Sequence, residues 1–127
     1  KNAQLAKEIQ AGKDKVNFNR AGAGVVCLQS VGLQDDPMVQ KAIRTISERA
    51  FSPNEDKSHF WYGHYYASVA LYHYGGENWK SYYPKICEKI MKDWEGKAGA
   101  KDGSVLDTGW SILVMGVPYR YLPIYQR

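Results

Sequence analysis

Two histidines and one aspartate are the residues whose types suit metal binding or acid–base chemistry in this chain. His59 and His64 open an uncharged stretch, residues 59–76, and Asp107 directly precedes another, residues 108–119. Two imidazoles and a carboxylate can hold a divalent metal or transfer protons. However, a spacing of five residues places the two histidines about 140° apart around a helix, so they share no face. We therefore favour structural roles over catalysis: His64 is hydrogen-bonded within an aromatic layer, and Asp107 caps its helix through a turn at 108–109.

The stretch HFWYGHYYASVALYHYGG, residues 59–76, carries seven aromatic rings and no Lys, Arg, Asp or Glu. Aromatic faces can stabilise the carbocations of isoprenoid chemistry. Core packing alone explains most of these rings, although each buried tyrosine hydroxyl needs a partner. If a ligand pocket exists, the residues expected to line it are His59, Trp61, Tyr62, His64, Tyr65, Asp107 and Trp110. No metal site and no cofactor is predicted.

The elements that position these residues are predicted to be helices. Uncharged stretches at 21–34, 59–76 and 108–119 alternate with charged ones at 36–50 and 78–94. Within 36–50, Val39, Ile43 and Ile46 share one helical face, and Asp36 and Pro37 suit the N-cap and the first helical position. No segment shows the sustained alternation of a strand.

The second charged stretch has a similar apolar stripe, interrupted by a proline. Tyr83, Ile86, Ile90 and Trp94 lie along one face. Because proline is unfavourable inside a helix, Pro84 predicts a short turn from residue 78 and a main helix that begins near Tyr83.

The alternation of uncharged and charged helices repeats every 43 residues. The matching pairs are Leu28 and Leu71, Gly32 and Gly75, and Ile43 and Ile86. This spacing is typical of two-helix repeats, with glycine closing the turn after the first helix. The chain thus holds about three hairpins, the last truncated after its uncharged helix.

The uncharged segment 59–76 is expected to be an inner helix, buried on all sides. One narrow face would admit a neighbouring helix, and two others carry larger side chains. The three faces are Gly63, Ala67, Ala70 and Tyr74; Trp61, Tyr65, Ser68 and Tyr72; and Tyr62, Tyr66, Val69 and His73.

Three segments resemble a known family. YYASVALYHYGGENWKSYYPKI, the DGSV at 102–105 and the ending ILVMGVPYRYLPIYQR are similar to the last repeats of bacterial squalene-cyclase-like proteins, which carry prenyltransferase and squalene oxidase repeats. The resemblance covers residues 21–127. It implies an all-α fold, the α/α toroid, in which inner helices surround a cavity and outer helices enclose them. Residues 1–127 would then form one helical-repeat domain, about half a ring, from the C-terminal part of a longer toroid.

The chain departs from the catalytic motifs of that superfamily. It lacks the DxDD motif of squalene-hopene cyclases, and the pair Asp35–Asp36 suits helix capping instead. It also lacks the QxxxGxW repeat and the GCGEQ thioester motif, and Val105 stands where DGSW has its tryptophan. The regions matching the zinc ligands of prenyltransferase β subunits read FWYGHYY, without cysteine, and Asp-Thr-Gly at 107–109. The resemblance therefore implies a fold and a cavity without an inherited mechanism.

Charge and cysteine content narrow the function classes further. The 17 basic and 13 acidic residues give a net charge of +4, and they are interspersed rather than clustered, which disfavours nucleic-acid binding. Cys27 and Cys87 lack metal-ligand spacing and are expected to be small buried residues, paired only if the fold brings them together. No uncharged run suffices for a membrane span, and no compartment is indicated.

The resulting expectation is a toroid domain that binds an apolar or isoprenoid-type ligand, with catalysis left open. The half ring would be completed by a homodimer or by the remainder of a longer chain. Two alternatives remain: an open α-solenoid that binds a protein, and a cyclase or prenyltransferase whose catalytic residues lie in repeats outside this sequence.

Overall fold

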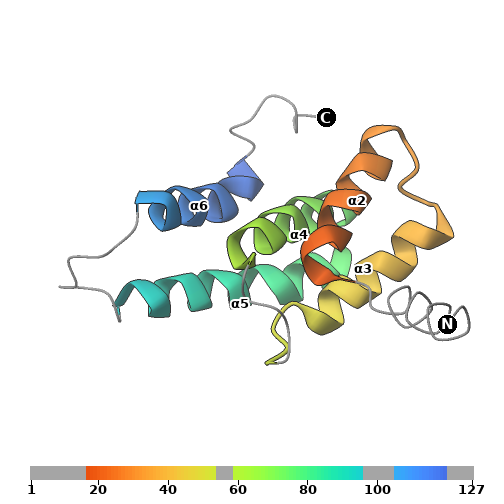
Figure 1. Cartoon of the computed structure of the whole chain (residues 1–127). Coiled ribbons are helices and arrows are strands. Elements are labelled where there is room, and N and C mark those ends of the chain that lie inside the picture. The colour runs from red at the N-terminus through yellow and green to blue at the C-terminus, as the bar shows by residue number, and fades with distance from the viewer. Residues whose placement is uncertain (1–16, 54–58, 96–104, 120–127) are drawn as a thin grey trace, which may run out of the picture.

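The computed structural model describes residues 17–53, 59–95 and 105–119, which form helices and their connecting turns. The helices are α2 (Phe18–Ser30), α3 (Pro37–Arg49), α4 (Phe60–Tyr74), α5 (Gly76–Glu95) and α6 (Val105–Gly116), followed by a short 3₁₀ turn, η1 (Val117–Tyr119). Figure 1 shows α4 in the middle, with α2 and α6 on either side of it. The prediction of an all-α fold is confirmed for these residues, which contain no strand.

Local sequence signals set the ends of the first two helices. Asp36 accepts a hydrogen bond from the backbone N–H of Met38 at 2.7 Å, and Pro37 occupies the first turn, as predicted. At the end of α2, the N–H groups of Gly32 and Leu33 bond back to the carbonyls of Gln29 and Leu28. Gly32 has a φ of 82°, so this is a Schellman turn, which glycine adopts without Cβ strain.

The glycines after α2 and α4 fit the predicted 43-residue spacing, although six residues separate α2 from α3 and Gly75 alone separates α4 from α5. Gly75, 43 residues after Gly32, ends α4 with a φ of 74°. Ile43 and Ile86 occupy equivalent buried positions in α3 and α5. Each hairpin therefore consists of an uncharged helix, a turn that needs a left-handed residue, and an amphipathic helix.

The largely uncharged helix α2 and the uncharged helix α4 run in the same direction and approach closely. A Cβ atom built on Gly63 would lie 3.0 Å from the Phe18 ring, and one built on Gly22 would lie 2.7 Å from the backbone nitrogen of Ala67. Further along, the side-chain amide of Gln29 donates to the carbonyl of Ala70 at 3.0 Å. Helix α2 therefore packs against the predicted narrow face of α4, which consists of Gly63, Ala67, Ala70 and Tyr74.

The opposite side of α4 packs against α6, which also runs in the same direction. Near the helix starts, the indole N–H of Trp61 donates to the carboxylate of Asp107 at 2.8 Å. One turn later the rings of Tyr65 and Trp110 lie 5.6 Å apart, centroid to centroid. The uncharged helices thus form a row in the order α2, α4, α6.

The amphipathic helices α3 and α5 cover another side of this row. Their buried stripes supply much of the core: Val39, Ile43 and Ile46 from α3, and Tyr82, Ile86 and Ile90 from α5. Near the turn, the Ser47 hydroxyl bonds to the Asn78 side chain at 3.0 Å, which joins the two helices. On the solvent side of α5 the charges form ion pairs between Glu77 and Lys80, Glu88 and Lys92, and Lys89 and Asp93.

Two predicted helix boundaries are wrong. Helix α5 continues through Pro84 from Gly76, without a turn at residue 78. Pro84 is exposed, so water can hydrate the backbone carbonyl that proline leaves without an N–H partner. Asp107 and the following Thr108–Gly109 lie inside the first turns of α6, which begins at Val105, so Asp107 is not the residue that precedes the helix.

Two predictions about burial also require correction. Cys27 is exposed rather than buried, because it lies on the side of α2 away from α4. Cys87 is half-buried, and both cysteines are free thiols. In α5 the fully buried tyrosine is Tyr82, while Trp94 is 48% exposed. The buried face of α5 therefore begins at Tyr82, one residue before the predicted Tyr83.

Substituting alanine for Gly22 and for Gly24 tests the close approach of α2 to α4. The added methyl group at Gly22 meets the backbone of α4, whereas at Gly24 nothing lies within 4 Å. We expect Gly22→Ala to lower the free energy of unfolding by about 1–3 kcal/mol through overpacking. Gly24→Ala should raise it by up to about 1 kcal/mol through helix propensity.

Urea unfolding followed by circular dichroism gives both values. Equal effects of the two alanines would contradict the packing argument, because the residues share a helix and differ only in what faces them.

Candidate functional site

His64 lies in the core, in contact with three phenylalanine rings. It is 2% exposed. The centroid of its ring lies 4.3 Å from Phe60, 5.1 Å from Phe18 and 5.6 Å from Phe51. These rings come from α4 itself, from the start of α2 and from the turn after α3. The predicted aromatic layer around His64 is therefore present.

Nδ1 and the backbone carbonyl of His64 form hydrogen bonds with Tyr82 and Ser68. The Tyr82 hydroxyl lies 2.9 Å from Nδ1 of His64 and donates to the His64 carbonyl at 3.1 Å. The Ser68 hydroxyl donates to the same carbonyl at 2.7 Å and lies 3.3 Å from the Tyr82 hydroxyl. The Nδ1 contact with Tyr82 forms in either tautomer of His64: a protonated Nδ1 donates to the hydroxyl, and an unprotonated Nδ1 accepts from it.

Burial keeps this cluster uncharged. Desolvation lowers the pKa of His64 from 6.5 to about 3, and the positive charge of Lys89 acts in the same direction. Desolvation also raises the pKa of Tyr82 far above its ordinary value, against a smaller opposing effect of the Ser68 hydrogen bond. A neutral imidazole and a neutral phenol form hydrogen bonds here without burying a charge. The geometry indicates a structural cluster.

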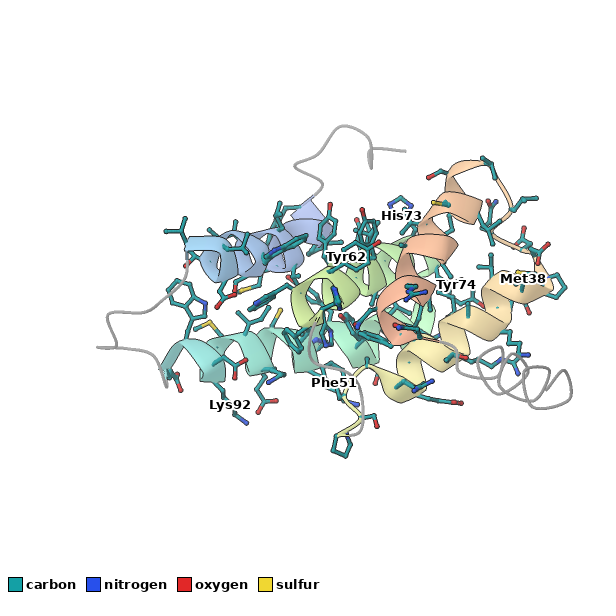
Figure 2. All side chains as sticks on the ribbon, viewed as in Figure 1. Met38, Phe51, Tyr62, His73, Tyr74 and Lys92 are labelled. Carbon is teal, nitrogen blue, oxygen red and sulfur yellow. The ribbon has the colours of Figure 1, made fainter. Side chains whose placement is uncertain are left out.

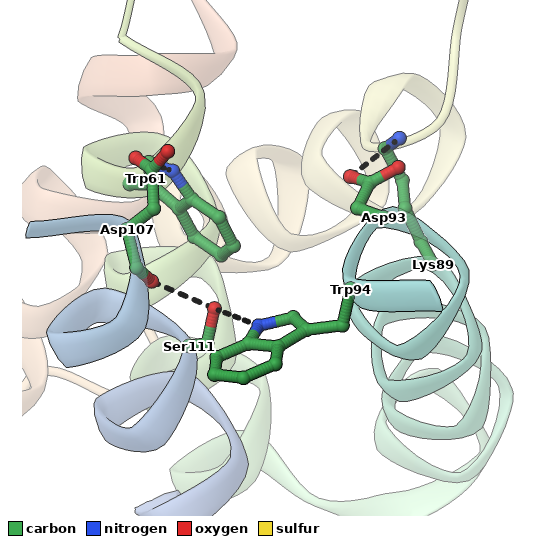
Figure 3. A network of polar contacts seen from close by, with 6 residues as sticks. All are labelled: Trp61, Lys89, Asp93, Trp94, Asp107 and Ser111. Carbon is green, nitrogen blue, oxygen red and sulfur yellow. Dashed lines mark hydrogen bonds and ion pairs between the residues drawn. The ribbon is translucent and has the colours of Figure 1, made fainter. Parts of the chain in front are cut away.

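A second polar group joins α4, α5 and α6 (Figure 3). Asp107 accepts from Trp61 through its carboxylate and from the Ser111 hydroxyl through its carbonyl, at 2.8 and 2.7 Å. Ser111 in turn accepts from the indole N–H of Trp94 at 3.4 Å. Asp107 and His64 therefore have separate partners, and the structure shows no shared acid–base pair.

Two of the predicted ligand-lining residues lie on exposed parts of α4. His59 occupies the N-cap position and is exposed, and Tyr62 is 39% exposed. Figure 2 shows Tyr62 and His73 on the side of α4 away from α5. Tyr66 lies between them on the same stripe, with its ring 4.8 Å from that of Tyr62. This stripe, Tyr62, Tyr66, Val69 and His73, is called the aromatic face below.

The predicted ligand-lining residues Tyr65, Trp61 and Trp110 pack beneath or beside the aromatic face. Tyr65 is 8% exposed, with its ring 5.2 Å from Tyr66 and 5.6 Å from Trp110. Trp61 and Trp110 are half-buried between α4 and α6. Next to them α6 exposes Leu106 and Leu113. The arrangement offers uncharged aromatic and aliphatic surface, with tyrosine hydroxyls at its edge.

Two residues of the buried cluster, Ser68 and Tyr82, were not predicted as partners of His64. Tyr82 stands 43 residues after Val39, which is also buried, so extending the repeat through α5 would have indicated its burial. The serine carries no such signal, because a hydroxyl inside an uncharged helix also bonds to its own backbone without any tertiary partner.

A hollow of about 210 Å³ lies on the outer surface of α5 and is lined by charged side chains. These are Lys85, Glu88, Lys89, Lys92 and Asp93. Glu88 pairs with Lys92 at 2.6 Å and Lys89 with Asp93 at 3.3 Å, so both acids are already engaged. Within the described ranges no group of three or more His, Cys, Asp or Glu residues is placed to hold a metal ion.

Comparison with protein-family models, curated proteins and solved structures gives no match for this chain. The similarity to squalene-cyclase-like repeats therefore stays an expectation from the sequence. Among the described helices, none has the length and apolarity required to cross a membrane.

The depressed pKa of His64 predicts a loss of stability in mild acid. The unfolded chain binds a proton at this residue below its ordinary pKa of 6.5, whereas the folded chain binds one only near about 3. The free energy of unfolding should therefore fall as pH decreases between these values, by about 2 kcal/mol from roughly pH 7 to pH 5.

Denaturant unfolding of wild type, His64→Gln and His73→Gln at several pH values measures this dependence. His64→Gln should be less stable at neutral pH. Its free energy of unfolding should lack the decrease at low pH that is attributed to His64. His73→Gln alters an exposed histidine of the same helix and should retain it. The same pH dependence in all three proteins would refute the assignment.

Proposed function

We propose that this chain is a helical-repeat domain that binds an extended apolar ligand of the isoprenoid class on the aromatic face of α4. The observation that carries the proposal is the exposure of Tyr62 and His73 on this face of the central helix, where Tyr66 is half-buried and Val69 is buried. Helix α4 is covered by α2, α5 and α6, yet Tyr62 and His73 are exposed beside Tyr66. A central helix that only filled a core would need no tyrosines on its remaining open side.

The chemistry of the face suits an apolar chain. Helix α4 carries no Lys, Arg, Asp or Glu, and the one acidic residue of α6, Asp107, accepts a hydrogen bond from Trp61. Tyrosine rings contribute flat apolar surface, and their hydroxyls can bond to a polar end group of the ligand. The exposed Leu106 and Leu113 of α6 would extend the contact along a long hydrocarbon.

The sequence resemblance supports the same ligand class and an α/α toroid as the complete architecture. In a toroid the inner helices enclose a cavity, and the aromatic face of α4 would line it. The parallel course of α2, α4 and α6, with α3 and α5 packed along another side, is compatible with such a ring.

A second candidate is an open α-solenoid that binds a protein along this face. The exposure of Tyr62 and His73 within the chain supports this candidate too, because an open solenoid presents such residues to a partner. The kind of partner that binds distinguishes the two functions. The toroid predicts binding of a hydrocarbon, and the solenoid predicts binding of a folded or extended protein.

Farnesol binding tests the proposal. Titration of the full chain with farnesol, followed by tryptophan fluorescence and by calorimetry, should give saturable binding. Tyr62→Ala and Tyr66→Ala should each weaken it at least about tenfold, equivalent to ~1.4 kcal/mol, because each substitution removes a ring from the contact surface.

Tyr74→Ala is the matched control. Tyr74 lies in the same helix with the same 39% exposure as Tyr62, but about 120° away around the axis. It should bind farnesol like the wild type. Absence of saturable binding, or equal weakening by all three substitutions, would contradict the proposed function.

A further inference from the structure

Helix α6 buries a smaller part of its residues than the central helix of the row. Two of its 12 residues are buried, Ser111 and Val114, and of these only the valine is apolar. In α4, eight of the 15 residues are buried. Because the burial of apolar surface is the dominant favourable contribution to folding, α6 is attached more weakly than α4.

Helix α6 also packs against fewer elements. Helix α4 contacts α2, α3, α5 and α6, whereas α6 packs mainly against α4 and the turn η1 that follows it. The seam between α4 and α6 is formed by Trp61 and Tyr65 from α4 and by Asp107 and Trp110 from α6. Separation of α6 would therefore uncover one side of α4 and leave its other sides covered.

Aromatic side chains of α4 and α5 donate hydrogen bonds to α6. Near the start of the helix Trp61 donates to Asp107 at 2.8 Å, and near its end the Tyr83 hydroxyl donates to the carbonyl of Met115 at 2.7 Å. Trp61 and Tyr83 are half-buried, so water can replace these partners when α6 separates. A hydrogen bond that is exchanged for one to water contributes only modestly to stability.

The core of α2–α5 does not depend on α6. The six largest fully buried side chains all come from these four helices: Phe18, Ile43, Ile46, Leu71, Ile86 and Ile90. The contact between His64 and Tyr82 and the close approach of Gly22 to Ala67 also lie within α2–α5. Regions with few buried apolar contacts open at a lower free energy than the core of the same protein.

We infer that α6 is a cover that separates from α4 as one unit while α2–α5 stay folded. Opening uncovers Tyr65, which is 8% exposed in the closed form, together with the inner sides of Trp61 and Trp110. The Tyr65 ring lies 5.2 Å from that of Tyr66, so the open form extends the aromatic face around α4. The inference concerns the attachment of one helix and does not depend on the proposed ligand.

Native-state hydrogen exchange of the full chain, followed by NMR at increasing low concentrations of urea, measures this opening. The backbone amides of residues 109–116 should exchange through one common opening free energy. After correction for intrinsic rates, they should exchange at least about tenfold faster than the slowest amides of α4.

Two adjacent tyrosines give a matched pair of variants. Tyr83→Phe removes the hydroxyl that bonds to the Met115 carbonyl, and we expect it to raise the opening constant of α6 about fivefold, with exchange in α2–α5 unchanged. Tyr82→Phe removes a hydroxyl that bonds to His64 within the core. It should speed the slowest exchange of α4 and leave the opening constant of α6 at the wild-type value.

Three results would overturn the inference. If the amides of α6 are as protected as those of α4, α6 opens only when the whole chain unfolds. If exchange slows gradually from the ends of α6 towards its middle, the helix frays and does not separate as a unit. If Tyr83→Phe speeds exchange equally in α6 and in α2–α5, the five helices form one cooperative unit. Farnesol binding is a separate measurement, so either proposal can fail alone.

Discussion

The backbone contact between α2 and α4 is the constraint on which the rest of the structure depends. Gly22 and Gly63 allow the two helices to approach until no Cβ atom fits between them. This approach brings Phe18 against the His64 ring and Gln29 within reach of the Ala70 carbonyl. A larger separation would open space beside His64, and the loss of such packing in a core is costly.

The absence of charge in α4 follows from its central position. A Lys or Glu on the sides facing α2, α5 or α6 would be removed from water without a partner. His64 is the only buried residue of α4 whose side chain could carry a charge near neutral pH. Burial holds its pKa at about 3. Its hydrogen-bonding groups instead tie α4 to Tyr82 of α5, so polarity is retained where charge is excluded.

The sequence predicted those features that depend on local backbone chemistry or on the repeat. The Asp36 cap and the left-handed Gly32 and Gly75 follow from short-range rules, and Ile43 and Ile86 follow from the 43-residue period. Each of these signals acts within one helix or one hairpin, so it can be recognised without knowing how the hairpins pack.

Features that depend on packing between hairpins were not predicted. The helix boundary expected at Asp107 was wrong because α6 begins at Val105, and the carboxylate of Asp107 accepts from Trp61, 46 residues earlier in the chain. The break expected at Pro84 was wrong because an exposed site tolerates the lost hydrogen bond. Cys27 was expected to be buried because it lacks metal-ligand spacing and cysteine is usually a small buried residue, and only the position of α4 shows that it lies on the outer side of α2.

Apolar and small residues are exposed on the two end helices of the row, α2 and α6. Helices α2, α4 and α6 have similar, largely uncharged sequences, but among the described helices of this row only α4 has a neighbour on both sides. The exposed aliphatic residues of α6 and the exposed small residues of α2 therefore occur at the two places where the row stops. A monomer gains nothing from Val105 or Ile112 in water, whereas a further helix packed there would bury them as α4 buries its own.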